Sequence, residues 1–319
     1  MNDVSFLELV SRYSADRHLR PKSVSTYTGV VRLFRRYLEA DAYPSMVTRD
    51  MVVTWRESIV RSASNPEGIA ESSWNNYARH LKALYRFGIK YQLIAITSNP
   101  FEEVSLKLPR KPKKTLTTSQ VKTAREALKI CRRYESDYNE PSVMHPAWFW
   151  QVVMETFYYT GIRLNQLLCI KVAEINLRER VFVASAEGSK NNNEMSLPIP
   201  APLYPYMSEL LVAAHHAGFR KGDQLYNVNR FSERHRRSEM DTWQVEGFFK
   251  KLSQYSGGKI TPHRFRHTLA TEMMQNPEKN IHMARDILNH KDLRSTLEYV
   301  HPDVEAMRDF LDQRRSADM

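Results

Sequence analysis

The sequence predicts a mainly helical protein of two domains, the second of which also contains a small antiparallel β-sheet. Apolar residues recur at helical spacing through most of the 319 residues. A segment with two prolines among five cations, residues 106–115, interrupts that spacing. Between residues 180 and 199, two short apolar runs flank a polar turn, which is typical of a β-hairpin.

Residues 1–106 are expected to form a bundle of helices. They contain four apolar stripes, each with the spacing of a helix that buries one face. The stripes are Phe6, Leu9, Val10 and Tyr13; Tyr27, Val30, Val31, Phe34 and Leu38; Met51, Val52, Trp55 and Ile59; and Trp74, Tyr77, Leu81, Leu84 and Tyr85. Thr48 is the expected cap of the third helix. Basic residues on the polar faces could line a nucleic-acid backbone, although a solvated helix surface explains each of them equally well.

A linker is predicted at residues 107–115. The preceding helix ends at Asn99-Pro100, because proline disfavours helical geometry in the residue before it and has no N–H to continue the ladder. The prolines and clustered charges that follow favour an extended chain without a core of its own. The second domain is therefore expected to span residues 116–319.

Helices alternate with one hairpin in the first part of this second domain. Thr117 or Thr118 is the expected cap of a helix that continues to Tyr134, and Pro146 opens another helix, which Gly161 ends. Strands are predicted at residues 180–184 and 195–199, with residues 189–194 as their polar turn. Further helices are expected over residues 203–216 and 243–255, and residues 230–239 form a cationic loop or helix start.

The stretch 260–301 gathers side chains suited to phosphate chemistry. Thr261 followed by Pro262 signals a helix start, so His263 and Arg266 lie three residues apart on one face, where one anion could contact both. Residues 283, 287 and 288 have the spacing of a buried face, residues 289–292 break the helix, and residues 295–301 form another short one. This last segment carries Tyr299, and a tyrosine becomes a nucleophile only where cations or a base stabilise its phenolate.

The composition indicates what kind of partner the protein binds and in which cellular compartment it works. The formal charge of +11 and the pI near 9.5 predict a polyanionic partner, without separating DNA from RNA or an acidic membrane. Cys131 and Cys169 lie in apolar helical patterns and are expected to be free thiols. The sequence shows no signal peptide, membrane span, nucleotide-binding loop or zinc-ligand spacing, which favours a cytoplasmic protein.

The order of several short motifs resembles the tyrosine recombinase family, also called integrases. Residues 263–267 read H-R-F-R-H, residues 288–290 read L-N-H, and Tyr299 follows nine residues later. Upstream, residues 160–163 read T-G-I-R, and Lys190 lies at the predicted hairpin tip, where the family places a lysine. The resemblance implies six catalytic residues, namely Arg163, Lys190, His263, Arg266, His290 and Tyr299.

The family's activity is site-specific recombination, in which DNA strands are cut and rejoined through a 3′-phosphotyrosine, without metal, ATP or another cofactor. The resemblance implies that Arg163 and Arg266 bind the non-bridging phosphate oxygens, that Lys190 protonates the leaving 5′ oxygen, and that His263 exchanges the tyrosine proton. His290 would hydrogen-bond a phosphate oxygen. His267 and His301 would brace the site without contacting the phosphate.

The resemblance also implies an architecture and partners. Residues 1–106 would be a core-binding domain that forms a C-shaped clamp on DNA together with the catalytic domain. The partners would be double-stranded DNA with paired half-sites, other copies of the chain in a tetramer, and in some systems accessory DNA-bending or directionality proteins. An apolar stripe of Val304, Met307, Phe310 and Leu311 would dock on a neighbouring protomer or on its own domain. The chain begins almost directly with the core-binding helices, as in simple Xer-like or mobile-element integrases.

Two positions depart from the family's pattern. Asn165 and Gln166 replace a common serine and glutamate, which removes a carboxylate that could orient neighbouring groups. Asn289 replaces a common glycine, and asparagine tolerates left-handed backbone geometry better than most residues.

Three other functions compete with recombination. A type IB topoisomerase or a telomere resolvase would use the same chemistry with a different outcome. A non-catalytic architectural DNA-binding protein would keep the basic surface but has no reason to keep all six residues in order. A metal-dependent hydrolase built on His263, His267, His290 and His301 lacks an accompanying carboxylate cluster.

Overall fold

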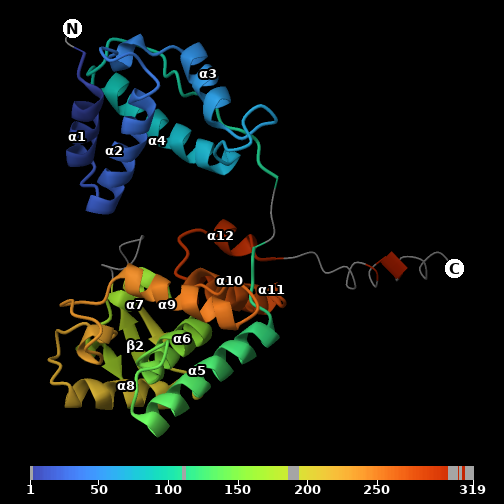
Figure 1. The fold of residues 1–319 in the computed structure, drawn as a ribbon. Helices are drawn as coiled ribbons and strands as arrows, with labels where there is room; N and C mark the ends of the chain where they lie inside the picture. The colour runs from blue at the N-terminus through green and yellow to red at the C-terminus, as the bar shows by residue number, and fades with distance from the viewer. Residues whose placement is uncertain (1–2, 110–112, 186–193, 301–307, 309–310, 313–319) are drawn as a thin grey trace. The chain divides into compact units, whose positions relative to one another are not determined.

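The computed structural model describes residues 3–109, 113–185, 194–300, 308 and 311–312. The chain divides into two compact units, residues 1–111 and 112–319. Figure 1 shows that both units are mainly helical and that the second also contains a small sheet. The predicted fold class, mainly α with a small antiparallel sheet, is confirmed.

The first unit is a helical bundle around an aromatic core. Its helices are α1 (Phe6–Asp16), α2 (Pro21–Arg35), η1 (Pro44–Met46), α3 (Arg49–Ile59) and α4 (Glu71–Lys90). The rings of Phe34 and Trp55 have centroids 4.6 Å apart, and those of Trp55 and Trp74 are 5.2 Å apart. The Trp74 indole N–H donates to the Val104 carbonyl at 2.9 Å, which holds the segment after α4 against the bundle. Thr48 caps α3 as expected.

The second unit is arranged around the apolar helix α6 (Ala147–Thr160), which contacts α5 (Thr118–Tyr138), α8 (Tyr204–His216) and α10 (Pro262–Met273). Thr117 caps α5 in a capping box with Gln120. In the second half of α6, the buried Glu155 accepts two hydrogen bonds at 2.7 Å from Arg125, which ties α5 to α6. Before α10, the described chain also forms α7 (Leu164–Leu168), η2 (Val172–Glu174), η4 (Val228–Arg230) and α9 (Thr242–Tyr255).

The sheet has the strand order β1-β2-β3, all antiparallel. Its strands are β1 (Ile175–Asn176), β2 (Val181–Ala184) and β3 (Met195–Pro198). The pairing of Phe182 with Leu197, both buried, sets the register of the predicted hairpin. The two-residue strand β1 was not predicted, because a segment that short carries no periodicity.

After α10, the chain forms α11 (Pro277–Ile287) and α12 (Leu293–Leu297). One prediction here was wrong: Met283 is 50% exposed, and Ala284 is the buried residue of α11. The helix presents Ala284 and the following Leu288 to α10, where they pack with Ala270, so Met283 faces the other side. The final apolar stripe lies outside the described residues, apart from Leu311, which is exposed.

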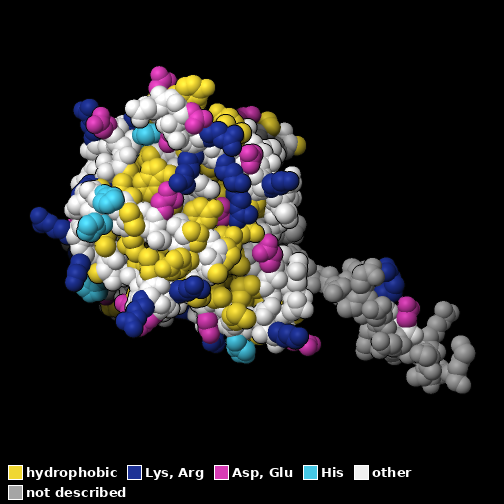
Figure 2. All heavy atoms as spheres, turned by 90° about the horizontal axis from the view of Figure 1, so that it is seen from below, with side chains coloured by type: hydrophobic (Ala, Val, Ile, Leu, Met, Phe, Trp, Pro, Cys, Tyr) yellow, Lys and Arg dark blue, Asp and Glu magenta, His cyan; other side chains and the backbone are white. Residues whose placement is uncertain are grey.

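The surface of the second unit mixes apolar and charged side chains. Figure 2 shows apolar patches with lysines, arginines and acidic residues between them on the face turned down in Figure 1. Exposed apolar side chains on α5 and α8 include Ile130, Tyr138 and Val212. Cys131 and Cys169 are free thiols, as expected.

Candidate active site

The site is built on the first turns of α10. Thr261 is the N-cap of this helix, its hydroxyl accepts from the Arg264 backbone N–H at 3.2 Å, and Pro262 occupies the first turn. This start orients His263, Arg266 and His267 on successive turns. The rings of His263 and His267 lie 4.0 Å apart.

Arg266 is buried and held by two backbone carbonyls. Its Nη1 donates to the Gly161 carbonyl at 2.9 Å and its Nη2 donates to the Leu288 carbonyl. Gly161 ends α6 with φ +57° and Leu288 ends α11, so two helix ends aim their carbonyls at one guanidinium. Burial, together with the nearby charge of Arg163, lowers the pKa of Arg266 to about 9. The site therefore holds a largely desolvated cation, which an anion would stabilise.

Arg163 lies at the start of α7, one residue after the buried Ile162. Its Nη2 donates to the Asn289 carbonyl at 3.3 Å, and its Nη1 is buried without a hydrogen bond. Burial lowers the pKa of Arg163. Gln166, where the family commonly has glutamate, accepts from the Arg163 backbone N–H at 3.4 Å, so its amide oxygen orients the backbone there. Asn289 has φ +46°, the left-handed geometry expected at this position.

Tyr299 is only 6% exposed and lies between two histidines. Its hydroxyl is 2.8 Å from His267 Nδ1, and the His290 ring is parallel to the tyrosine ring within 10° at a centroid distance of 6.3 Å. His290 Nδ1 is in turn 2.9 Å from the Thr296 hydroxyl on α12. The nucleophile candidate is therefore held by packing and by one hydrogen bond.

Opposing effects act on the phenol. Burial raises the pKa of Tyr299, and the charges of Arg266, Lys113 and Arg163 lower it. Burial also lowers the pKa of His267 to about 4, with a contribution from His263. His267 is thus neutral near pH 7, and with its proton on Nε2 its Nδ1 accepts from the Tyr299 hydroxyl. A neutral imidazole in that tautomer can take the phenol proton.

Arg163, His263 and Arg266 line one open pocket with a volume of about 810 Å³. Lys250 and Lys259 line it too, which adds positive charge around the two guanidinium groups. The motifs separated by a hundred residues in the sequence thus converge on one cavity. A phosphate that entered it would meet donors from both arginines.

The other residues predicted for the site have different outcomes. Lys190 and His301 lie outside the described residues. His267, expected only to brace the site, is the histidine whose Nδ1 lies 2.8 Å from the Tyr299 hydroxyl. The sequence signal for His267 was its place one helical turn after His263. Lys113 was missed altogether: its ammonium lies 5.9 Å from the centre of the Tyr299 ring.

In the part of the chain that the structure describes, no group of three or more His, Cys, Asp or Glu side chains gathers as a metal site would require. The same residues include no helix with the length and apolar character needed to cross a membrane.

Comparison with known proteins gives the family: the sequence profile of the phage integrase family matches residues 114–306. The chain belongs to that family.

Named relatives cover nearly the whole chain. It is 35% identical over 314 residues to a putative tyrosine recombinase XerC of Pseudomonas syringae, covering 98% of this chain and 65% of that protein. It is 35% identical over 311 residues to a putative tyrosine recombinase XerC of Pseudomonas aeruginosa, covering 97% of this chain and 72% of that one. The chain thus spans about two thirds of the length of these relatives.

Solved structures share the fold. The integrase of transposon Tn1549, in complex with transposon right end DNA, superposes with a TM-score of 0.73 at 16% identity and covers 98% of this chain and 100% of that one. A lambda integrase dimer bound to a COC′ core site gives a TM-score of 0.65 at 18% identity, covering 94% of this chain and 78% of that one.

Proposed function

We propose that this protein is a site-specific recombinase that cuts and rejoins DNA strands with Tyr299 as the nucleophile. The observation that carries the proposal is the Tyr299 hydroxyl, hydrogen-bonded to His267 and close enough to Arg163 and Arg266 for both charges to lower its pKa. A phenol beside a neutral imidazole and two cations is the arrangement that turns a tyrosine into a nucleophile. The family and the names of the relatives support the same reaction.

In the proposed step, the Tyr299 oxygen attacks phosphorus of a DNA phosphodiester. A bond forms between that oxygen and phosphorus, and the bond from phosphorus to the 5′ oxygen breaks, leaving a 3′-phosphotyrosine. The phenol proton passes to His267 or His263, and the departing 5′ oxygen takes a proton to become a hydroxyl. A 5′ hydroxyl from another strand reverses the step, which conserves the phosphodiester energy.

The residues predicted for the site have distinct roles in this step. Arg163, with a buried nitrogen that makes no hydrogen bond, and Arg266 would bind the non-bridging oxygens and stabilise the charge of the pentavalent transition state. His290, parallel to the Tyr299 ring, would hydrogen-bond a phosphate oxygen. Lys190 remains the predicted acid for the leaving oxygen, on sequence grounds alone.

The partners follow from the same proposal. The substrate is duplex DNA with paired half-sites, bound by the basic surface that the charge of +11 indicates. Residues 1–106 would be the core-binding domain, residues 107–115 the linker and residues 116–319 the catalytic domain. Four copies of the chain would form the synapse, with the segment after residue 303 joining neighbours.

The experiment traps the covalent intermediate. The probe is a pool of duplexes with a randomised core and a nick, so that the short 5′-hydroxyl fragment diffuses away after cleavage. Denaturing gels should show a protein–DNA adduct with the parent, from which the reactive sequence is recovered. Tyr299→Phe should bind that sequence with nearly the parent's affinity and give no adduct, because only the nucleophilic oxygen is lost.

Tyr255→Phe is the matched control, since Tyr255 is an exposed tyrosine at the end of α9. It should form adduct like the parent. A parent that forms no adduct with any duplex of the pool, or an adduct that persists in Tyr299→Phe, contradicts the proposal.

A further inference from the structure

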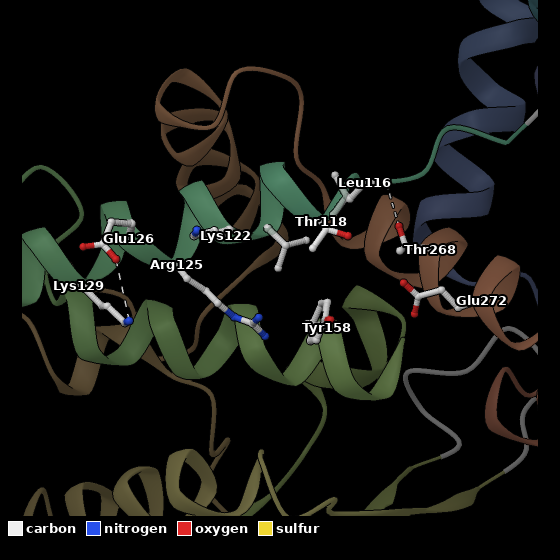
Figure 3. Close-up of a pocket in the computed structure, with 10 residues that line it drawn as sticks. Leu116, Thr118, Lys122, Arg125, Glu126, Lys129, Tyr158, Thr268 and Glu272 are labelled. Atoms are coloured by element: carbon white, nitrogen blue, oxygen red, sulfur yellow. Dashed lines mark hydrogen bonds and ion pairs between the residues drawn. The ribbon is translucent and has the colours of Figure 1, made fainter.

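The chain that enters the second unit is anchored beside the site. The Leu116 backbone N–H donates to the Thr268 hydroxyl at 2.8 Å, and both residues are buried (Figure 3). Thr268 follows His267 on α10, and its hydroxyl also donates to the Arg264 carbonyl at 2.8 Å. The residues just before Leu116 therefore start from a fixed point on the helix that carries the site.

Three residues before that anchor, Lys113 reaches the nucleophile. Its Nζ lies 2.7 Å from a carboxylate oxygen of Glu298, the residue that precedes Tyr299. The same nitrogen lies 5.9 Å from the centre of the Tyr299 ring. The segment from Lys113 to Leu116 thus has one attachment on α10 and another at the end of α12, on either side of the His267–Tyr299 hydrogen bond.

The strength of the ion pair does not explain this arrangement. The side chains of Lys113 and Glu298 are 35% and 60% exposed, and exposed pairs contribute about 0–1 kcal/mol to stability. Position matters more, because a tyrosine must meet phosphorus in line, and misplacement by about 1 Å can cost on the order of 100-fold in rate. α12 has only five residues, so the segment that carries Tyr299 has little rigidity of its own.

We propose that Lys113 is a positioning residue for strand cleavage: the anchored segment holds its ammonium against Glu298 and the face of the Tyr299 ring, which aims the nucleophile. This inference rests on the proposed function. Its further consequence is a connection along the chain, since Lys113 comes two residues after the end of the first unit at residue 111.

The first test measures adduct formation on the trapped duplex, at saturating DNA and across pH. Lys113→Gln should slow cleavage about 10-fold and move the rising limb of the pH profile to higher pH, since the phenolate loses a cation. Lys113→Arg should recover most of the rate, because it keeps the charge and the ion pair. Glu298→Gln should also slow cleavage, but with the rising limb displaced to lower pH.

Lys114→Gln is the matched control, an exposed lysine next in the chain. It should keep the parent's rate and pH profile. Equal losses in Lys113→Gln and Lys114→Gln, or a parental rate in Lys113→Gln, overturn the inference.

A second test needs no DNA and separates failure of this inference from failure of the proposed function. Carbon-13 labelling of the tyrosine ring, with Tyr299 assigned from the spectrum of Tyr299→Phe, gives the phenol titration by NMR. Relative to the parent, Lys113→Gln should titrate at higher pH and Glu298→Gln at lower pH, whereas Lys114→Gln should match the parent. A Tyr299 titration that Lys113→Gln leaves unchanged overturns the inference even if the parent cleaves DNA.

Discussion

Among single residues, Arg163 gives the clearest indication that the site binds a phosphate. Its Nη1 is buried without a hydrogen bond and its Nη2 donates to Asn289. A buried donor without a partner costs stability, so the site holds a preformed position for an acceptor such as a phosphate oxygen. The exclusion of solvent that lowers the pKa of Arg163 also strengthens that contact.

Arg163→Lys should therefore fail although it keeps the charge. A lysine is a point charge on a flexible stem and cannot reproduce two parallel donors in a fixed plane. Cleavage of the trapped duplex should fall about 100-fold, on the scale of a lost preorganised donor. Arg178→Lys, in the turn between β1 and β2, is the control; similar rates for the two variants would return Arg163 to a structural role.

The buried His267 and the half-buried His290 predict how stability depends on pH. Burial lowers the pKa of His267 and of His290 to about 4, below the ordinary value of 6.5. As pH falls below 6.5, both histidines become protonated in the unfolded chain, whereas in the folded protein they stay neutral until about pH 4. Their contribution to stability is therefore complete above pH 6.5 and is lost as pH falls towards 4.

Denaturant titrations between pH 7 and pH 4 test this sign. Between pH 7 and pH 4, the free energy of unfolding should fall less in His267→Asn than in the parent. The difference should be at most a few kcal/mol, since one pKa unit corresponds to about 1.4 kcal/mol. The exposed His216→Asn should leave the slope as in the parent. A slope in His267→Asn as steep as the parent's would show that this histidine titrates normally in the folded protein.

The sequence predicted which residues belong to the site better than it predicted which of them contact one another. It predicted Arg163, His263, Arg266, His290 and Tyr299 as one site, and the structure brings the three residues 163, 263 and 266 to one pocket and stacks 290 on 299. It did not predict that His267 meets the tyrosine, because that depends on how α10 packs against the chain after α12. Lys113 was missed because no motif connects residues so distant in sequence.

At the scale of elements, helix ends position the site. Gly161 ends α6 in left-handed geometry, and its carbonyl accepts from Arg266. The C-terminal end of α11 supplies the Leu288 carbonyl to Arg266 and the Asn289 carbonyl to Arg163. These ends were predictable, because capping chemistry is local: Thr48, Thr117, Thr261 and Gly161 all act as expected. The exposure of Met283 was not, because apolar spacing cannot say which face of a helix meets a neighbour.

Gly161→Ala tests the role of the α6 end. A Cβ there would lie 2.9 Å from Leu269 Cδ2 in a backbone of φ +57°, so we expect a loss of about 1–3 kcal/mol in stability. Cleavage should fall as well, since the Gly161 carbonyl would shift under Arg266. Thermal melting and the adduct assay measure both effects.

The control is the same substitution where the structure has room. Gly247 lies within α9 with nothing within 4 Å of an added Cβ, so Gly247→Ala should be neutral or stabilising by about 0.5–1 kcal/mol. A Gly161→Ala protein as stable as the parent would show that neither the left-handed backbone nor the contact with Leu269 requires glycine at this position.

At the scale of the whole molecule, the sequence predicted a mainly helical fold with one small sheet, and the phage integrase family confirms its class. This success has a physical reason: helical stripes and turn residues report on local structure, which dominates such a fold. The arrangement of the two units on DNA depends on contacts with DNA and with other copies of the chain. The clamp and the tetramer therefore remain proposals.

The most direct test of the central claim is to locate the covalent bond. The trapped adduct of the full chain is digested with protease and nuclease, and the modified peptide is sequenced by tandem mass spectrometry. If Tyr299 is the nucleophile, a nucleotide will be joined to it through its 3′-phosphate, and the released fragment will carry a free 5′ hydroxyl. A nucleotide on any other residue, or one joined through a 5′-phosphate, would contradict this role of Tyr299.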